Sequence, residues 1–275
     1  MMIGGDDSLD VSIVVYGHSE QEIFDVVSSL LISCDSTSLN FVKIFIADNK
    51  GEFNFTVFKG LVRNIPIKIK YDTSYIRLEK NLGYGVANNR CIKSGSGFFH
   101  LVLNPDVIFK RSSMANGIDI LKSSSENILV SPKILDSNKN VVSGIKRHPS
   151  LLVLILRFFD SSFLNGLFSN RLKRYECRDI LEIDRPAYVT IASGCCMLTK
   201  KSFLLKSNGF DEKYFLYFED FDLSLRLSKL GKLVYSPDFK VIHYGGHTGK
   251  KGIKHIFYFL NSMNRFFNTY GLKII

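Results

Sequence analysis

Three apolar segments, each ending in polar residues, limit the folds open to this chain more than any other feature. They are "VSIVVY" (Val11–Tyr16), "FVKIFIADN" (Phe41–Asn49) and "FFHLVLNPD" (Phe98–Asp106). Near-continuous apolar runs of this length are typical of strands buried on both faces, as in parallel sheets covered by helices. The segment "IKIKY" (Ile67–Tyr71) alternates apolar and polar residues and is a candidate for a further strand.

Helical patterns separate the predicted strands. Ser19 and Glu22 have the spacing of a capping box, and apolar residues then recur with helical period at Ile23, Val26, Val27, Leu30 and Leu31. In "NLGYGVANN" (Asn81–Asn89), two glycines precede a second expected helix. This alternation predicts an α/β fold with a Rossmann-like, mostly parallel central sheet flanked by helices.

Polar residues gather where the predicted strands end. Tyr16 closes the first strand, Asp48 and Asn49 close the second, and Asn104 and Asp106 close the third. In sheets of this kind, ligands bind beyond the carboxyl ends of the strands. The chain has no GxGxxG or Walker sequence, which argues against ordinary dinucleotide-binding and P-loop proteins. We therefore expect the first half of the chain to bind a nucleotide in another way.

Two positions could belong to a metal site. Asp106 in "LNPDV" directly follows a buried strand, and hard cations such as Mg²⁺ take oxygen ligands that they share with substrate phosphates. A simple Pro-Asp turn is the alternative. The segment "HYGGHT" (His243–Thr248) places two histidines in a glycine-rich loop after the short strand "KVIH". Lone histidines are more often structural than ligands, so these residues leave the question open.

The segment "FDEKYFLYFEDFDLSLRL" (Phe210–Leu227) places five carboxylates among six aromatic rings. Helical period begins near Asp220, with Leu223, Leu227 and Leu230 on one face and Gly231 as the C′ residue. A helix N-terminus favours acidic residues by ~0.3–1 kcal/mol, which would explain part of the cluster. The aromatic residues are too many for a solvated cap. A carboxylate in a partly dry aromatic pocket has its pKa raised toward values useful to a general base.

The basic character of the chain lies in two late segments. The formal net charge is +10; residues 139–178 contain eight Lys/Arg and two acids, and residues 240–275 contain six Lys/Arg and no acid. Basic patches bind nucleic acid, anionic membranes or phosphorylated ligands. Each segment also contains an apolar helical pattern. One is "PSLLVLILRFF" (Pro149–Phe159), and the other is the stripe formed by Ile256, Phe259, Leu260, Met263, Phe266 and Phe267.

Both apolar patterns have two interpretations. The first pattern is too short to span ~30 Å of hydrocarbon, which needs about 20 residues. Packing in the core and binding to an anionic bilayer are equally compatible with either pattern. The five cysteines include no CxxC pair, which favours reduced thiols over a disulfide framework or a zinc site. The first ten residues are polar and acidic, so we expect a cytoplasmic chain with no leader peptide.

Taken in order, these segments resemble the motifs of the family 2 glycosyltransferases, which have the GT-A fold. The motifs run from Val11 to Tyr270 and include "ADN", "NLGYGVANN", "LNPDV", "SGCCMLTKKSF", "GFDEKYFLYFEDFDLSLRLSKLG" and "VIHYGGHT". Each motif alone is weak, but the ordered set is specific. The "LNPD" and "FDE…Y.ED.DL..R" forms are most similar to the rhamnosyltransferase-like branch that builds bacterial O-antigens and related polysaccharides.

The resemblance implies a domain organisation. A GT-A domain would occupy residues 1–250, followed by a basic amphipathic, membrane-facing helix over residues 251–275. Within the domain, a nucleotide-sugar-binding half would cover about 1–110. An acceptor half would cover about 111–250 and contain the basic apolar insertion 139–178.

The resemblance also implies roles for single residues. Asp220 would be the general base, and Glu219 would help position the acceptor. Asp106 and His243 would hold a divalent cation, Mg²⁺ or Mn²⁺. Asp106 would carry most of the coordination, because Asn104 stands at the first acidic position of the family's DxD motif. The donor would be contacted by Tyr16, Asp48, Asn49, Asn81, Gly83 and Asn104.

The expected activity is inverting transfer of a sugar from a nucleotide-sugar. The donor would be a dTDP- or UDP-sugar, with dTDP-rhamnose as the first choice from the resemblance. The acceptor would be an oligosaccharide on undecaprenyl pyrophosphate, met at the anionic inner face of the plasma membrane in the synthesis of O-antigen lipopolysaccharide.

Three alternatives compete with this activity. A UDP-hexose-dependent transferase would share the fold. A sugar nucleotidyltransferase would be expected to carry a glycine-rich, Arg/Lys-bearing loop where this chain has "YGHSEQE". A basic nucleic-acid-binding protein would show a basic groove with interleaved aromatic residues. The carboxylate cluster would repel phosphates, so we expect no nucleic-acid partner.

Overall fold

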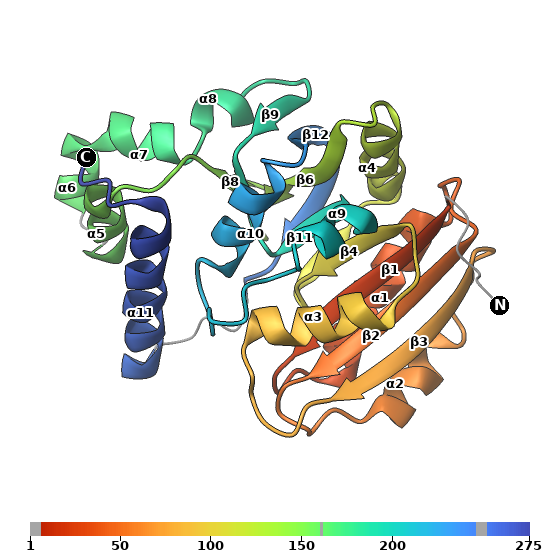
Figure 1. Ribbon diagram of the computed structural model, residues 1–275. Coiled ribbons are helices and arrows are strands. Elements are labelled where there is room, and N and C mark those ends of the chain that lie inside the picture. The colour runs from red at the N-terminus through yellow and green to blue at the C-terminus, as the bar shows by residue number, and fades with distance from the viewer. Residues whose placement is uncertain (1–6, 160–161, 246–251) are drawn as a thin grey trace.

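The computed structural model describes residues 7–159, 162–245 and 252–275. Within these residues, Figure 1 shows a twisted central sheet with helices on both faces, and a group of helices beyond one end of it. The strand order is β3-β2-β1-β4-β11-β6-β12-β5, with β7 beside β6 and β9 beside β12. This arrangement confirms the predicted α/β class with a mostly parallel central sheet.

The first half of the chain forms a parallel sheet by alternation of strands and helices. Its strands are β1 (Ser8–Val15), β2 (Phe41–Asp48), β3 (Lys70–Arg77) and β4 (Phe99–Leu103), and its helices are α1 (Glu20–Cys34), α2 (Phe55–Val62) and α3 (Tyr84–Ser94). Every residue of β1 is buried, including Val11–Val15 of the predicted run, whereas Tyr16 lies beyond the strand and is 55% exposed. Successive side chains of a strand point to opposite faces, so Ile13 belongs to the core cluster under α1 and Val14 to the one under α3.

Two local predictions in this half have different outcomes. The capping box at α1 is confirmed, because Ser19 accepts a hydrogen bond from the Glu22 amide and the Glu22 carboxylate accepts one from the Ser19 amide. The predicted strand at 67–71 is wrong in extent. The carboxylate of Asp35 accepts hydrogen bonds from the amides of Lys68 and Ile69, at 2.7 and 2.9 Å. These two amides are therefore unavailable to the sheet, and β3 begins only at residue 70.

The second half adds antiparallel pairings. Strand β11 (Cys196–Lys200) lies antiparallel between β4 and β6 (Asn127–Leu135), and β12 (Lys232–His243) then runs parallel to β6. The short strands are β5 (Val107–Phe109), β7 (Val141–Val142), β9 (Ala187–Val189) and a separate pair, β8 (Ile145–Lys146) with β10 (Ile191–Ala192). The helices on this half are α4 (Ser113–Lys122), α9 (Lys201–Lys206) and α10 (Glu219–Leu227).

Helix α10 begins where the sequence predicted, but its end differs. Leu223 and Leu227 are buried, whereas Leu230 is 43% exposed and lies beyond the helix. Gly231 does not have the left-handed conformation of a C′ residue. Its backbone instead packs closely on the start of β6, where an added Cβ would lie 2.6 Å from Ile128 Cγ2 and 2.8 Å from the carbonyl oxygen of Glu126. This glycine is therefore explained by tertiary packing rather than by helix termination.

The two basic segments fold together at one end of the molecule. The insertion forms α5 (Leu151–Phe159), α6 (Ser162–Leu167), α7 (Ser169–Tyr175) and the start of α8 (Arg178–Leu181), and the C-terminal segment forms α11 (Ile253–Tyr270). The C-terminal tail passes the start of α5, whose Leu151 and Leu152 amides donate to the carbonyls of Lys273 and Ile274. No helix among the described residues is long and apolar enough to cross a membrane.

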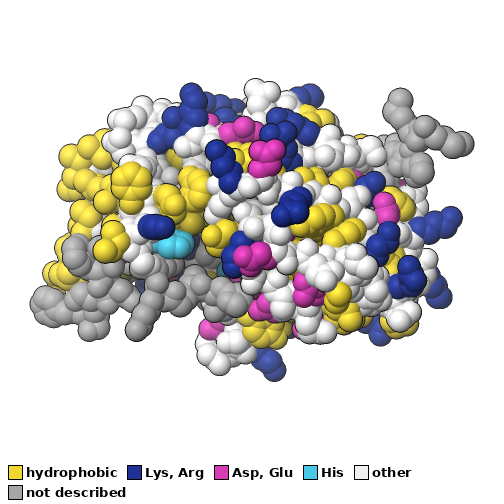
Figure 2. All heavy atoms as spheres, turned by 90° about the horizontal axis from the view of Figure 1, so that it is seen from below, with side chains coloured by type: hydrophobic (Ala, Val, Ile, Leu, Met, Phe, Trp, Pro, Cys, Tyr) yellow, Lys and Arg dark blue, Asp and Glu magenta, His cyan; other side chains and the backbone are white. Residues whose placement is uncertain are grey.

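The apolar stripe of α11 is divided between core and surface. Phe266 and Phe267 are buried in a cluster with Leu154 of α5, whereas Ile256 and Leu260 are 37% and 49% exposed. Figure 2 shows hydrophobic side chains gathered at the left end of the molecule, the end that carries α5 and α11 in Figure 1. Part of the stripe is therefore core, and part faces solvent.

Candidate active site

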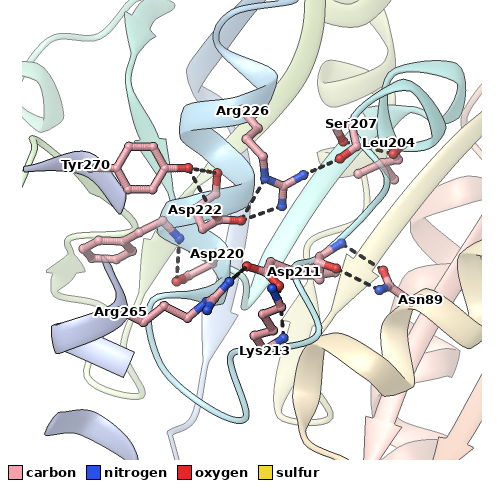
Figure 3. Close-up of polar contacts among 12 residues, drawn as sticks. Asn89, Leu204, Ser207, Asp211, Lys213, Asp220, Asp222, Arg226, Arg265 and Tyr270 are labelled. Atoms are coloured by element: carbon pink, nitrogen blue, oxygen red, sulfur yellow. Dashed lines mark hydrogen bonds and ion pairs between the residues drawn. The ribbon is translucent and has the colours of Figure 1, made fainter. Parts of the chain in front are cut away.

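The carboxylates of the aromatic segment do not share one role. Asp211 binds Arg265 of α11 at 2.6 Å. Asp222 is buried, binds Arg226 at 2.6 Å and accepts a hydrogen bond from the Tyr270 hydroxyl at 2.7 Å. Figure 3 shows Asp211 bound by Arg265 and Asp222 bound by Arg226. These two acids attach α11 to the aromatic segment, through Arg265 and Tyr270.

A third acid is also occupied. Glu212 accepts a hydrogen bond from the Asn89 amide at 3.0 Å and lies 3.9 Å from Lys93. Among the described residues, Glu219 and Asp220 form no ion pair. The structure thus separates three structural carboxylates from two that remain available for chemistry.

These two carboxylates differ in their surroundings. Asp220 accepts hydrogen bonds from the amides of Gly194 and Phe221, each at 2.9 Å. Glu219 is 6% exposed, and its Oε2 atom is buried with no hydrogen-bond partner in the described structure. Burial and then the adjacent Asp220 raise the pKa of Glu219 to about 8. Burial also raises the pKa of Asp220, while the Gly194 and Phe221 amides act against that rise.

The proton of the pair therefore belongs on Glu219. A buried oxygen without a hydrogen bond is poorly suited to negative charge, and the two amides that bind Asp220 stabilise its carboxylate form. Asp220 is then the member that can accept a proton, and Glu219 is the one that can donate a hydrogen bond.

Backbone strain precedes the pair. Tyr217 and Phe218 have φ values of 69° and 63°, in the left-handed region that costs non-glycine residues roughly 1–2 kcal/mol each. Their rings pack on Phe259 of α11, and the Phe218 ring also contacts Phe266. Strain of this kind persists only where the surrounding structure holds it. Helix α11 therefore fixes the position from which Glu219 and Asp220 project.

A cavity of about 640 Å³ opens beside the two carboxylates. The basic segments supply most of its walls: Lys146, Leu154, Arg157 and Tyr175 come from the insertion, and His255, Ile256 and Phe259 come from α11. The pKa of Lys146 is lowered to about 8, first by burial and then by Arg157. Its positive charge in turn opposes the rise in the pKa of Asp220. The sequence did not single out Lys146 as a site residue.

Asp48, at the end of β2, is hydrogen-bonded to the loop that follows that strand. It is 1% exposed, and its oxygens accept hydrogen bonds from the amides of Lys50, Gly51 and Phe53 and from the Tyr75 hydroxyl, at 2.8–2.9 Å. These bonds outweigh burial and lower the pKa of Asp48. In this structure Asp48 shapes the loop, and its expected contact with a nucleotide stays a prediction.

Asn49 links the loop after β2 to the turn before α3. Its side chain donates to the Gly83 carbonyl and accepts from the Leu82 amide, and Asn81 accepts from the Gly83 amide at 3.0 Å. Gly83 has φ 90°, and an added Cβ would lie 2.4 Å from the carbonyl oxygen of Phe215. Asn49, Asn81 and Gly83 therefore meet, as predicted for one pocket, and Gly83 also brings that pocket against the aromatic segment.

A second chain of contacts joins α3 to Asp220. The Tyr84 hydroxyl donates to the Gly194 carbonyl at 2.7 Å, and the Gly194 amide donates to Asp220. An added Cβ at Gly194 would lie 3.2 Å from the Cβ of Asp220. In the sequence, Gly194 is marked only by its place in the motif "SGCCMLTKKSF", and that motif alone predicted no role for it.

Asp106 and His243 lie together, as predicted for a metal site. His243 Nε2 is 3.1 Å from Asp106 Oδ1, yet that buried oxygen has no aligned hydrogen bond in the described structure. Burial would raise the pKa of Asp106, but the adjacent His243 lowers it. Strand β12 places the two side by side, because His243 pairs with Val107. Asn104 precedes this pair, and its amide donates to the Cys195 carbonyl.

The donor atoms fit a divalent cation that is shared with substrate. No group of three or more Asp, Glu, His or Cys side chains within the described ranges could hold a metal alone. One carboxylate and one imidazole leave several coordination positions for phosphate oxygens, as is usual for Mg²⁺ at nucleotide sites. The second histidine of the predicted motif, His247, lies outside the described residues. Tyr16, at the end of β1, is 55% exposed and available to a ligand.

Replacing Glu219 should change the pH dependence of stability. The folded-state pKa of about 8 lies above the ordinary value, so the stability contributed by Glu219 is full below pH ~4.5 and is lost as pH rises through 8. We expect the free energy of unfolding of Glu219→Gln to fall less than that of the wild type between pH 5 and 9, measured by denaturant titration. Exposed Glu79→Gln is the control. Parallel curves for wild type and Glu219→Gln would contradict the buried, protonated state.

Comparisons with known proteins give relatives of one kind. No family model matches the chain. It is 31% identical over 191 residues to "N-acetylglucosaminyl-diphospho-decaprenol L-rhamnosyltransferase" of Mycobacterium tuberculosis, a match that covers 64% of this chain and 60% of the relative. It is 26% identical over 249 residues to "Rhamnosyltransferase WbbL" of Escherichia coli K12, covering 87% and 85%. The chain thus spans about 60% of the length of its mycobacterial relative.

Solved structures show the fold. TarS residues 1–349 of S. aureus matches 95% of this chain and 72% of its own with a TM-score of 0.58, at 14% identity. A mannosyltransferase of Pyrobaculum calidifontis, in complex with GDP-Man and Mn²⁺, matches 88% of this chain and 58% of its own with a TM-score of 0.57, also at 14%. The sequence relatives and the GT-A fold together support a rhamnosyltransferase-like family 2 glycosyltransferase, which confirms the resemblance shown by the motifs.

Proposed function

We propose that the protein is an inverting glycosyltransferase that moves a sugar, with rhamnose from dTDP-rhamnose as the first choice, to a hydroxyl of a lipid-linked saccharide. One observation carries the proposal. Asp220 is a carboxylate without an ion pair among the described residues, it is held by two amides, and it faces a cavity large enough for a sugar. The names of the sequence relatives support the sugar and the lipid-linked acceptor.

The chemistry needs one base. The acceptor hydroxyl would lie in the cavity beside Asp220, which accepts its proton as the oxygen forms a bond to the anomeric carbon of the donor. The bond from that carbon to the nucleoside diphosphate breaks on the opposite side, so the anomeric centre is inverted. Protonated Glu219 would donate a hydrogen bond that positions the acceptor. A single displacement requires no second nucleophilic carboxylate.

The donor would lie across the strand ends from this cavity. The loop shaped by Asp48 and the turn joined by Asn49 and Gly83 would enclose the nucleotide. Tyr16 and Asn104 would complete the pocket. A divalent cation held by Asp106 and His243 would neutralise charge on the leaving diphosphate.

We further propose that the protein is cytoplasmic and peripheral on the inner face of the plasma membrane, in surface polysaccharide synthesis. Apolar residues of α11 face solvent, with Ile253 86% and Phe257 61% exposed. The segment that contains them is basic and has no acidic residue. Apolar and cationic side chains on one helix are typical of binding to an anionic bilayer.

A nucleotide-sugar screen tests the activity. We expect dTDP-rhamnose to raise the melting temperature more than UDP-glucose or GDP-mannose, and more in the presence of Mg²⁺ or Mn²⁺ than with chelator. Stabilisation by UDP-glucose instead would show a UDP-hexose transferase of the same fold. If no nucleotide-sugar stabilises the chain while a DNA duplex does at low salt, the transferase proposal is wrong.

A further inference from the structure

A second cavity lies behind the catalytic one. Its volume is about 800 Å³, and it is lined mainly by α7, the start of α5 and the C-terminal tail. The tail is fixed there by the hydrogen bonds from Leu151 and Leu152 to the carbonyls of Lys273 and Ile274. Neither the proposed chemistry nor the donor pocket uses this cavity.

The cavity is cationic. Arg171, Arg174 and Lys273 line it, and within the described part of the chain their charged groups form no ion pair. Arg147 also lines it but is bound to Asp179 at 2.6 Å. None of the described residues that line the cavity is acidic. Three unpaired cations around one cavity would repel each other, and an anion between them would remove that repulsion.

The position of the cavity relates it to the acceptor. Tyr175 lines both cavities, so the cationic space and the space beside Asp220 are neighbours. Consecutive residues also face the two spaces, because Lys146 lines the catalytic cavity and Arg147 the second one. A ligand bound beside Asp220 could therefore extend into the second cavity.

The rim of the cavity is apolar. Leu167 and Ile275 line it and are 69% and 65% exposed. Next to them, Leu272 and Ile274 are 60% and 62% exposed. They belong to the helical end of the molecule at which Figure 2 shows hydrophobic side chains gathered. A nucleic acid backbone or a free inorganic anion has no apolar chain that could pack on such a rim.

We propose that this cavity binds the diphosphate of a lipid-linked acceptor, with Arg171, Arg174 and Lys273 on the phosphates and the apolar rim on the first part of the lipid. The assignment rests on the proposed function and adds to it the place where the acceptor's linker is recognised. Phosphate oxygens accept charge-assisted hydrogen bonds from guanidinium groups in particular. The sugar next to the diphosphate would then point past Tyr175 toward Asp220.

Direct binding provides a test that does not depend on transfer. Farnesyl diphosphate carries the same two groups, a diphosphate and an isoprenoid, and is titrated by calorimetry in chelator to exclude binding through a cation at Asp106. We expect the triple variant Arg171→Gln, Arg174→Gln, Lys273→Gln to bind it at least about tenfold more weakly than the wild type. The control is Lys59→Gln, Lys70→Gln, Lys229→Gln, which removes the same charge from exposed, unpaired positions elsewhere, and we expect wild-type affinity.

The remaining outcomes distinguish failure of the proposed diphosphate site from failure of the proposed transferase function. Equal weakening in both triple variants would show general attraction and overturn the inference. The inference is also overturned if the cavity variant keeps its affinity for farnesyl diphosphate but loses binding to phosphatidylglycerol vesicles. That result would assign the three cations to bilayer headgroups. Where the wild type transfers sugar, the ratio of kcat/KM for a diphosphate-linked over an alkyl-linked acceptor should fall about tenfold in the cavity variant. An unchanged ratio would overturn the inference while the transferase stands; tight, cavity-dependent binding without any transfer would support it.

Discussion

Asp106→Ala should abolish sugar transfer and remove the metal-dependent part of nucleoside-diphosphate binding. The carboxylate has a buried oxygen without a hydrogen bond, next to the His243 imidazole, and Asn104 supplies no second charge. Alanine would leave one neutral ligand for a cation. We expect Mg²⁺ or Mn²⁺ to increase the thermal stabilisation by dTDP in the wild type and to have no effect in the variant, measured by melting temperature with and without chelator.

The control for this variant is Asp119→Ala, on the exposed side of α4, which should keep the wild-type response to metal. A melting temperature of Asp106→Ala close to that of the wild type, in the absence of ligand, would show that the fold is intact. Full transfer by the wild type in excess chelator would contradict the metal site. In that case the pair of Asp106 and His243 would be a structural contact between β5 and β12.

The sequence predicted elements whose signals are local. Strand β1 contains the near-continuous apolar run that begins at Val11, and the capping box of α1 needs only the pair Ser19 and Glu22, three residues apart. Local sequence patterns fail to predict structure where a residue distant in the chain contacts the same backbone groups. Asp35 takes two amides that "IKIKY" would have given to β3, and Gly231 is required by the carbonyl of Glu126. Neither competitor is visible from the segment itself.

The same limit applies to the site. The aromatic segment showed where carboxylates gather. Which of them are structural and which are available for chemistry could not be predicted without knowing their contacts in the fold. Asp211 and Asp222 are occupied by Arg265 and Tyr270, which lie 54 and 48 residues later in the chain. Asp48 was likewise recognisable as a carboxylate at a strand end. Only the folded loop shows that its oxygens accept hydrogen bonds from the amides of that loop. Pairing over such distances follows from the assembled fold.

Asp220→Asn should lower kcat by ~10²–10⁴, the usual contribution of a positioned general base. Asparagine keeps the size of the side chain and an oxygen that can accept from the Gly194 amide, so the local structure should be retained. Donor affinity should be nearly unchanged, because Asp220 is hydrogen-bonded to Gly194 and Phe221, neither of which is assigned to the donor. The measurements are kcat, and dTDP affinity by calorimetry.

The pH profile gives a second measure of the same role. The base must be ionised, and burial raises the pKa of Asp220 above its ordinary value. Wild-type kcat/KM should therefore fall as pH is lowered through that raised pKa, and the small remaining activity of Asp220→Asn should lack this fall. A fall of the same shape in both proteins would assign the titration to another group.

Two neighbouring carboxylates serve as controls for Asp220→Asn. Asp222→Asn weakens the contacts to Arg226 and Tyr270, so it should lower the melting temperature, while Asp220→Asn should leave it unchanged or raise it. Glu219→Gln keeps a hydrogen-bond donor at the position that burial keeps protonated, so it should change KM for the acceptor more than kcat. The assignment of the base is reversed if Glu219→Gln loses turnover and Asp220→Asn retains it, because a protonated Glu219 could not then be the resting state of the enzyme.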